Sequence, residues 1–261
     1  MQRGATPRTK DTVFASINDG QGTSMLAARD TSLQGNTMTM TPDRALNSPV
    51  QQKRARITRD VIVEAAATEF SRRGYAAASV NTIVAASERT KGAMYFHFRS
   101  KEALGQAVTA QASRRYAEIA EPWRTAALHP IDALGGLLDD VTAAAIGEPV
   151  LLAELRLGID PDFPSDPAGR ASRGWEDIAL ELANSAASDG CFAAPFDPTR
   201  FVHAAASMLA GGCLFAPMSD DPIALRARLD ECIDAVVAAM TTPQAAARYR
   251  AYSSSIATQR A

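Results

Sequence analysis

Apolar residues recur every three or four positions through most of this chain, and no run of alternating β-branched residues interrupts the pattern. Ile62, Ala66 and Phe70 lie at i, i+4 and i+8, which places them on one face of a helix. Thr58 is a suitable N-cap for that helix, and Gly74 is a residue type that commonly ends one. The same spacing returns almost to the end of the sequence, which predicts an all-α fold of about nine helices.

The expected helices are separated by residues that favour turns or begin helices. Gly147 and Pro149 divide two of them, residues 158–169 contain three prolines and three aspartates, and Asp197 followed by proline is a typical helix start. The nine expected helices cover residues 58–73, 80–86, 91–98, a segment capped by Ser100, 131–146, 150–157, 170–189, a segment that begins at Asp197, and 222–240.

Composition and charge divide the chain into regions. Residues 1–50 are rich in Thr, Ser, Gln, Asn and Gly without a sustained period, which predicts a disordered N-terminal extension. Residues 51–101 carry ten basic and four acidic side chains, a net of +6, whereas residues 102–261 carry twelve basic and twenty-one acidic ones, a net of −9. A basic module on an acidic body is typical of a protein that binds a polyanion.

Residues 79–99, SVNTIVAASERTKGAMYFHFR, have the pattern of a helix-turn-helix motif. A short helix, a tight turn and a second short helix are expected in that order. The second helix must enter a major groove about 12 Å wide, so its leading residues need to be small, or long and polar. Thr90, Lys91 and Gly92 meet this requirement. The sequence therefore predicts a DNA-binding domain at 51–101.

The candidate DNA-binding residues divide into base readers and phosphate donors. Lys91 is the main candidate for reading bases. Tyr95 and His97 lie where a phenol and an imidazole can donate to phosphate oxygens, with bracing of the helix and packing as their respective alternatives. Phe96 and Phe98 are expected in the core. The full set of candidates is Arg54, Arg56, Ser79, Arg89, Thr90, Lys91, Gly92, Tyr95, His97 and Lys101.

Two kinds of candidate lie outside the second helix of the motif. Arg54 and Arg56 are expected either to reach a minor groove or the DNA backbone, or to remain solvated. Lys101 begins the next helix, whose N-terminal amides can add a contact to phosphate.

The stretch from Thr58 to Lys101, with its AAA…F…GY, TKGAMYFHF and SKEAL elements, resembles the DNA-binding domain of the TetR family of transcriptional repressors. The KGAMYFHF form and the downstream sequence resemble the γ-butyrolactone-receptor branch of streptomycetes and their relatives. This resemblance implies a homodimer with a C-terminal ligand-binding and dimerisation domain, here residues 102–245 followed by a tail at 246–261. It also implies that Trp175 faces the signalling ligand. Trp123 and Phe215 are weaker pocket candidates, with plain packing as the alternative.

The implied function is a repressor that binds a palindromic operator on double-stranded DNA and is released by a small effector of the γ-butyrolactone or furan type. Control of antibiotic or other secondary-metabolite genes is the expected role. The alternatives are a regulator that has lost this ligand, one that responds to another hydrophobic molecule such as an antibiotic, and one that activates transcription. Helices between residues 131 and 189 are expected to enclose an apolar pocket, and helices at 198–217 and 222–240 to form the dimer seam.

Other classes of protein are poorly supported. No Ser/His/Asp elbow, paired-carboxylate motif or phosphate loop indicates an enzyme, so no catalytic residue, cofactor or metal site is predicted. Cys191, Cys213 and Cys232 form no CxxC pattern and are expected to be small buried residues in a reducing cytosol. No apolar stretch approaches the length of a membrane span and the N-terminus lacks a secretory h-region, so a cytoplasmic protein is expected. A purely structural helical module is the remaining rival.

Overall fold

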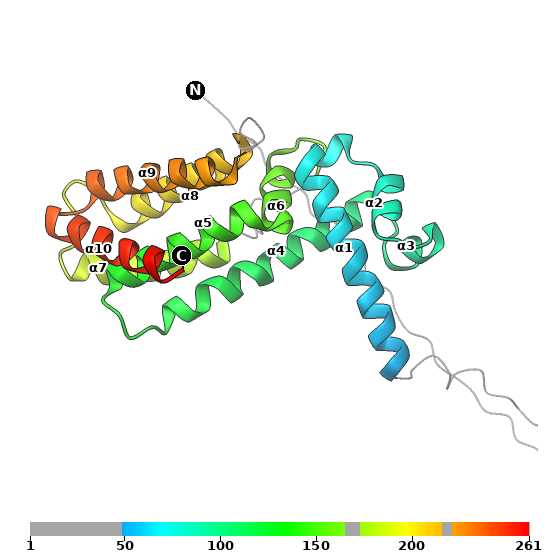
Figure 1. Ribbon diagram of the computed structural model, residues 1–261, viewed down its shortest axis with the longest axis horizontal. Helices are drawn as coiled ribbons and strands as arrows, with labels where there is room; N and C mark the ends of the chain where they lie inside the picture. The colour runs from blue at the N-terminus through cyan, green and yellow to red at the C-terminus, as the bar shows by residue number, and fades with distance from the viewer. Residues whose placement is uncertain (1–48, 165–172, 216–220, 261) are drawn as a thin grey trace, which may run out of the picture. The chain divides into compact units, whose positions relative to one another are not determined.

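The structure is a computed structural model that describes residues 49–164, 173–215 and 221–260 (Figure 1). Within these ranges it contains ten helices and no strand, which confirms the all-α prediction. All but the last two residues of the predicted extension at 1–50 lie outside the described residues. The helices are α1 (Pro49–Ala77), α2 (Val80–Ala86), α3 (Lys91–His97), α4 (Lys101–Arg124), α5 (Pro130–Gly147), α6 (Pro149–Ile159), α7 (Arg173–Ser188), α8 (Pro198–Phe215), α9 (Pro222–Met240) and α10 (Pro243–Arg260).

The first three helices and the N-terminal half of α4 enclose the smaller of two hydrophobic cores. Ile62 and Phe70 of α1, Ile83 of α2, Met94 of α3 and Leu104 of α4 are all fully buried there. Each helix thus buries one apolar face, as the spacing of its apolar residues in the sequence predicts. Because α2 and α3 are only seven residues long, their positions depend on this packing against α1 and α4.

The C-terminal half of α4 and helices α5, α7, α8, α9 and α10 enclose the larger core. Tyr116, Leu134, Trp175 and Phe201 come from four different helices, and each is at most 2% exposed. In Figure 1, α8, α9 and α10 lie at the opposite end of the described region from α2 and α3.

Helix α6 contributes to both cores. Leu151 packs in the larger core, whereas Ala153 and Leu157 pack in the smaller core. Figure 1 shows α6 beside α1, and these two helices share the most extensive contact of any helix pair described. The described residues fall within one compact unit, Leu46–Ala261, so the predicted domain boundary between residues 101 and 102 stays a prediction.

Helix α1 differs from its prediction at its start and agrees with it at Gly74. It begins at Pro49, well before Thr58, through a segment QQKRAR at 51–56. These residues have high helix propensity, but nearly all are exposed, so no apolar period marks them as helical. At the other end Gly74 has non-helical backbone angles, with a φ of 73° that glycine adopts without strain. The first regular part of α1 therefore ends at Gly74, as predicted, and a kink separates it from residues 75–77.

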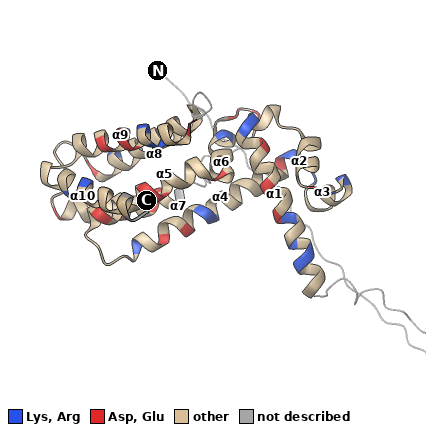
Figure 2. Ribbon diagram, in the orientation of Figure 1, with Lys and Arg blue, Asp and Glu red and all other residues tan. Residues whose placement is uncertain are grey.

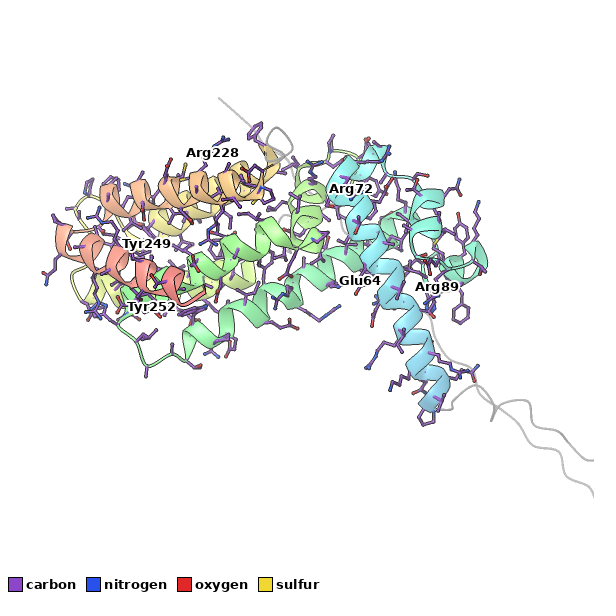
Figure 3. All side chains as sticks on the ribbon, viewed as in Figure 1. Glu64, Arg72, Arg89, Arg228, Tyr249 and Tyr252 are labelled. Carbon is purple, nitrogen blue, oxygen red and sulfur yellow. The ribbon has the colours of Figure 1, made fainter. Side chains whose placement is uncertain are left out.

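The predicted C-terminal tail at 246–261 instead forms most of α10. Tyr249 is 5% exposed and lies against Gly135 of α5 (Figure 3). Arg248 Nε donates to Asp132 Oδ1 at 2.9 Å, which ties α10 to the start of α5. Apart from Tyr249, the buried face of α10 consists mainly of alanines, and an alanine face gives no clear apolar stripe in a sequence.

The approach of α4 and α5 depends on a glycine beneath a tryptophan. The ring of Trp123 lies over Gly136, and a Cβ atom at Gly136 would overlap that ring. The indole Nε1 also donates to Asp140 Oδ2 at 2.8 Å, which fixes the orientation of the ring. Trp123 thus holds two helices together.

We expect Gly136→Ala to lower the free energy of unfolding by about 1–3 kcal/mol, because the added methyl group must displace the Trp123 ring. Chemical denaturation monitored by circular dichroism measures this change. Gly147→Ala is the matched control on the same helix. Nothing lies within 4 Å of a Cβ there, so alanine should stabilise the helix by up to about 1 kcal/mol. Equal stability of the Gly136→Ala and wild-type proteins would contradict the packing of Trp123 on α5.

Candidate DNA interface and ligand pocket

Hydrogen bonds fix α3 at both ends. Thr90 is its N-cap, and Thr90 Oγ1 accepts a hydrogen bond from the backbone N–H of Ala93 at 3.1 Å. At the other end, the N–H of Phe98 donates to the carbonyl of Met94 at 2.8 Å. Glu88 has a φ of 53°, which lets the chain turn sharply between α2 and α3. The helix is thereby presented in one orientation on the smaller core.

One face of α3 is buried and the other is exposed. Met94 is fully buried, whereas Lys91, Gly92 and Tyr95 are exposed on one side. Figure 2 shows basic residues near α3 and along the N-terminal part of α1. A short, rigidly held helix with small and long polar residues at its start has the geometry of a recognition helix. The structure therefore brings Lys91, Gly92 and Tyr95 together, and their contact with DNA stays a prediction.

Phe96 is not a core residue, which corrects the prediction. Its side chain is 82% exposed, whereas Phe98, also predicted in the core, is 4% exposed. Met94 and Phe98 occupy the inward positions at i and i+4, so Phe96 between them must point outward beside Tyr95. Placing α3 on a helical wheel anchored at Met94 would have revealed this exposed ring. Phe96 joins the candidate interface as a residue that the sequence analysis missed.

Lys101 and Ser79 make hydrogen bonds within the fold, and their predicted contact with DNA stays a prediction. Lys101 Nζ donates to the carbonyls of Tyr75, Ala76 and Ala78 at 2.8, 3.2 and 3.3 Å, and lies 4.5 Å from the centroid of the Tyr75 ring. The side chain of Ser79 is the N-cap of α2. Lysine near the C-terminal end of a helix satisfies carbonyls that have no partner within the helix.

The predicted arginines lie at two places. Arg54 and Arg56 are exposed on the N-terminal part of α1, ahead of the smaller core. Arg89 lies in the turn that precedes α3 (Figure 3), where its Nη1 donates to the carbonyl of Glu88 at 3.4 Å. Arg54 and Arg56 thus belong to a helix, which limits the minor-groove reach that a flexible arm would have.

His97 lies between two aromatic rings at the end of α3. The ring centroids of Phe96 and Phe98 are 5.1 and 6.3 Å from that of His97. Burial, and after it the positive charge of Arg59, lowers the pKa of the imidazole. The free protein therefore holds His97 uncharged at neutral pH.

A cavity of about 570 Å³ lies between α4, α6, α7 and α8, a size within the usual range for small-molecule sites. Trp175 and Tyr116 line it, and the predicted contact of Trp175 with a ligand stays a prediction. Burial, and after it the charge of Glu154, raises the pKa of Tyr116 well above its usual range, so its hydroxyl stays protonated. The lining residues are Tyr116, Glu154, Leu155, Gly158, Ile159, Trp175, Glu176, Asp177, Leu180, Thr199, Val202, His203, Ala206, Ser207, Leu209, Ala210 and Leu214.

The cavity differs from its prediction in composition and position. Acidic and hydroxyl side chains make its lining more polar than expected, and α5 contributes none of it, whereas α4 and α8 do. Neither Trp123 nor Phe215 lines the cavity: Trp123 packs on Gly136, and Phe215 is 71% exposed at the end of α8. No local sequence pattern could have excluded either residue from the pocket, because helices that lie far apart in the sequence form the cavity wall.

The described residues offer no group of three or more His, Cys, Asp or Glu side chains that could hold a metal ion. None of the described helices is long and apolar enough to cross a membrane. The three cysteines are free thiols. Burial raises the pKa of Cys213 to about 11, so this thiol remains protonated within the larger core.

Comparison with known proteins agrees with this geometry. Residues 62–108 match the family described as "Bacterial regulatory proteins, tetR family". The A-factor receptor protein of Streptomyces griseus is 48% identical over 58 residues, which are 22% of this chain and 21% of that protein. A crystal structure of a γ-butyrolactone receptor (ArpA-like protein) matches with a TM-score of 0.67 at 28% identity, covering 79% of this chain and 99% of that chain. CprB from Streptomyces coelicolor, solved in complex with its biological operator sequence, matches with a TM-score of 0.64 at 26% identity and the same two coverages, 79% and 99%.

The fold and the helix-turn-helix therefore resemble those of transcriptional regulators of the TetR family, whose DNA-binding region matches residues 62–108. More narrowly, the chain resembles the γ-butyrolactone receptors. The match to the curated receptor of S. griseus spans only about a fifth of that protein's length, 21%. The similar proteins are DNA-binding regulators rather than enzymes.

We expect Phe96→Ala to weaken DNA binding by up to about 1.5–3 kcal/mol, because a ring exposed in the free protein loses water contact only when DNA covers it. The thermal unfolding midpoint should stay close to that of the wild type. Met94→Ala, on the buried face of the same helix, is the control and should cost about 2–5 kcal/mol of stability. Fluorescence anisotropy and thermal denaturation measure the two effects. Unchanged DNA affinity of Phe96→Ala would exclude the ring from the interface.

The lowered pKa of His97 predicts a pH dependence of DNA binding. A phosphate partner favours the charged imidazole, so the pKa in the complex lies above that of the free protein. Binding then takes up a proton, and affinity should rise as the pH falls through the pKa of the complex. His97→Gln should flatten this slope in anisotropy titrations at fixed ionic strength, whereas His203→Gln, in the cavity, should not. The same slope in His97→Gln and the wild type would assign His97 to packing alone.

Proposed function

We propose that this chain is a homodimeric, ligand-responsive repressor that binds a palindromic operator and leaves it when a small signalling molecule occupies the cavity. The observation that carries the proposal is the exposed face of α3, with Lys91, Gly92, Tyr95 and Phe96 on a helix that is fixed at both ends. The match of residues 62–108 to the TetR family supports it. Such a regulator acts in the cytoplasm, where operator DNA is accessible.

The proposed dimer seam is formed by α8 and α9. Phe215 at the end of α8 is 71% exposed, and Ile223 at the start of α9 is 82% exposed. Large exposed apolar side chains are typical of surfaces that a partner covers. Small residues such as Ala204 and Gly211 on α8 would let a second copy approach closely. Phe215, predicted in the ligand pocket, is better placed for this seam.

The proposed operator contact follows from dimer symmetry. A two-fold axis places two copies of α3 on one face of the dimer, about one helical turn of DNA apart, or roughly 34–36 Å. Two equivalent recognition helices require two inverted half-sites, hence a palindrome. Phosphate contacts from the basic residues supply much of the affinity and make it fall with salt.

The proposed effector is a γ-butyrolactone or furan-type signal, and the regulated genes are those of antibiotic or other secondary metabolism. The resemblance to γ-butyrolactone receptors favours this class. The acidic and hydroxyl groups in the cavity favour, as the second candidate, another hydrophobic molecule with hydrogen-bond donors. In either case the effector must bind the released state more tightly than the DNA-bound state, and a difference of about 1–3 kcal/mol lowers operator affinity about 5–150-fold.

We expect Lys91→Ala to weaken binding to the selected operator by about 1–3 kcal/mol and to relax its base preference. The operator can be isolated by selection from a random DNA pool with the wild-type chain, and affinities measured by anisotropy at several salt concentrations. Arg114→Ala, an exposed arginine on α4, is the control for loss of one positive charge and should leave affinity unchanged. Unaltered affinity and preference in Lys91→Ala would refute its role, and failure of the wild type to select any sequence would refute the repressor itself.

A further inference from the structure

Residues 74–78, called the hinge segment below, join the body of α1 to α2 and through it to α3. The segment begins at the kink of Gly74, where φ is 73°. It ends one residue before Ser79, the N-cap of α2. The direction in which α2 and α3 leave α1 therefore depends on the placement of these five residues, as well as on the packing of both helices in the smaller core.

Two side chains of opposite charge hold the hinge segment, one through its N–H groups and the other through its carbonyls. Asp160 Oδ2 accepts hydrogen bonds from the backbone N–H groups of Tyr75 at 2.9 Å and Ala76 at 3.1 Å. Lys101 Nζ donates to the carbonyls of the same two residues and of Ala78. Charge-assisted hydrogen bonds to backbone groups are strong, so the hinge segment is clamped between a carboxylate and an ammonium group.

The two side chains that hold the hinge segment come from different parts of the molecule. Lys101 begins α4 and belongs with the helices of the smaller core. Asp160 directly follows Gly158 and Ile159, which line the cavity at the end of α6. Its second oxygen, Oδ1, accepts from the N–H of Asp162 at 3.0 Å, which orients the carboxylate on its own loop. A displacement of the end of α6 must therefore carry the Asp160 carboxylate with it.

Neighbouring contacts attach the same end of α6 to α1. Arg156 Nη1 donates to the carbonyl of Arg72 at 3.0 Å. The ring of Phe163 lies 5.1 Å from that of Tyr75, centroid to centroid, and packs against Gly105 of α4. These contacts fix the end of α6 close to the hinge segment, so that Asp160 meets its two amides at short range.

From this geometry we infer that Asp160 is the positioning residue through which occupation of the cavity changes the placement of α2 and α3. A molecule that displaces the cavity-lining end of α6 moves the carboxylate away from the amides of Tyr75 and Ala76, or pulls the hinge segment along. Either movement turns α3 relative to its copy in the dimer. The inference rests on the proposed function and names the residue that regulates it.

The test replaces the unidentified effector by a side chain that fills the cavity. Ala206 lines the cavity from α8, so Ala206→Trp should act as a fixed occupant. Affinity for the selected operator is measured for the full-length wild type, Ala206→Trp, Asp160→Ala and the double variant. In the wild-type background Ala206→Trp should weaken binding about 5–150-fold. In the Asp160→Ala background most of this weakening should disappear, because the link between α6 and the hinge segment is gone.

Three further variants separate coupling from simple stability. Asp162→Ala removes a nearby carboxylate whose side chain does not hold the hinge segment, so the full effect of Ala206→Trp should persist. Asp160→Asn keeps an oxygen acceptor of the same shape and should retain part of the effect. Ala247→Trp, at an exposed position on α10, should not change operator affinity. A merely structural role of Asp160 would lower the unfolding midpoint and leave the fold-change caused by Ala206→Trp the same in both backgrounds, which would overturn the inference.

Amide hydrogen exchange provides a measurement that needs no DNA and no variant of Asp160. Exchange at Tyr75 and Ala76 should be faster in Ala206→Trp than in the wild type, while exchange within α9 stays unchanged. Equal protection of the two amides in both proteins would overturn the inference. If the wild type selects no operator, the proposed function fails, and this exchange comparison still decides whether the cavity and the hinge segment are coupled.

Discussion

Two helices, α4 and α6, each bury side chains in both hydrophobic cores, and this shared burial determines how the rest of the protein is arranged. Leu104 and Tyr116 are fully buried in different cores although both belong to α4. Leu151 and Leu157 divide in the same way along α6. Since neither core can be repacked without moving a helix of the other, the candidate DNA-binding helices and the cavity are coupled through α4 and α6. A protein built as two separate bundles on a flexible linker would lack this property.

The parts of the fold that the sequence predicted are those in which burial gives a strong periodic signal. The stripes of α1, α8 and α9 consist of large apolar residues, and α2 and the start of α3 lie where their caps and spacing indicated. The wrong predictions concern segments in which burial gives only a weak periodic signal. The first residues of α1 are helical through intrinsic propensity without burial, and α10 is buried through alanines, so neither shows a strong apolar period.

The sequence predicted those parts of the candidate site whose residues are close together both in the sequence and in space. The face of α3 follows from seven consecutive residues, and its exposed members could be placed except for Phe96, whose apolar character suggested burial. The cavity wall comes from four helices spread over about a hundred residues, so its lining could not be read from any local pattern. The contacts of Lys101 within the fold were missed for the same reason, because its carbonyl partners lie between residues 75 and 78, 23 to 26 positions away.

The scale of the interactions at the hinge segment suits a reversible switch. Burial of residues such as Phe70 and Met94 suits a switch poorly, because these residues pack together in one core and exposing several of them, at about 1.5–3 kcal/mol each, would unfold it. A hydrogen bond to a charged group is worth about 1.5–3 kcal/mol, and Asp160 makes two to the hinge segment. That is the same order as the coupling of about 1–3 kcal/mol by which effectors typically change the affinity of a distant site. An exchange of these hydrogen bonds for water is therefore large enough to move α3 and small enough to leave both cores intact.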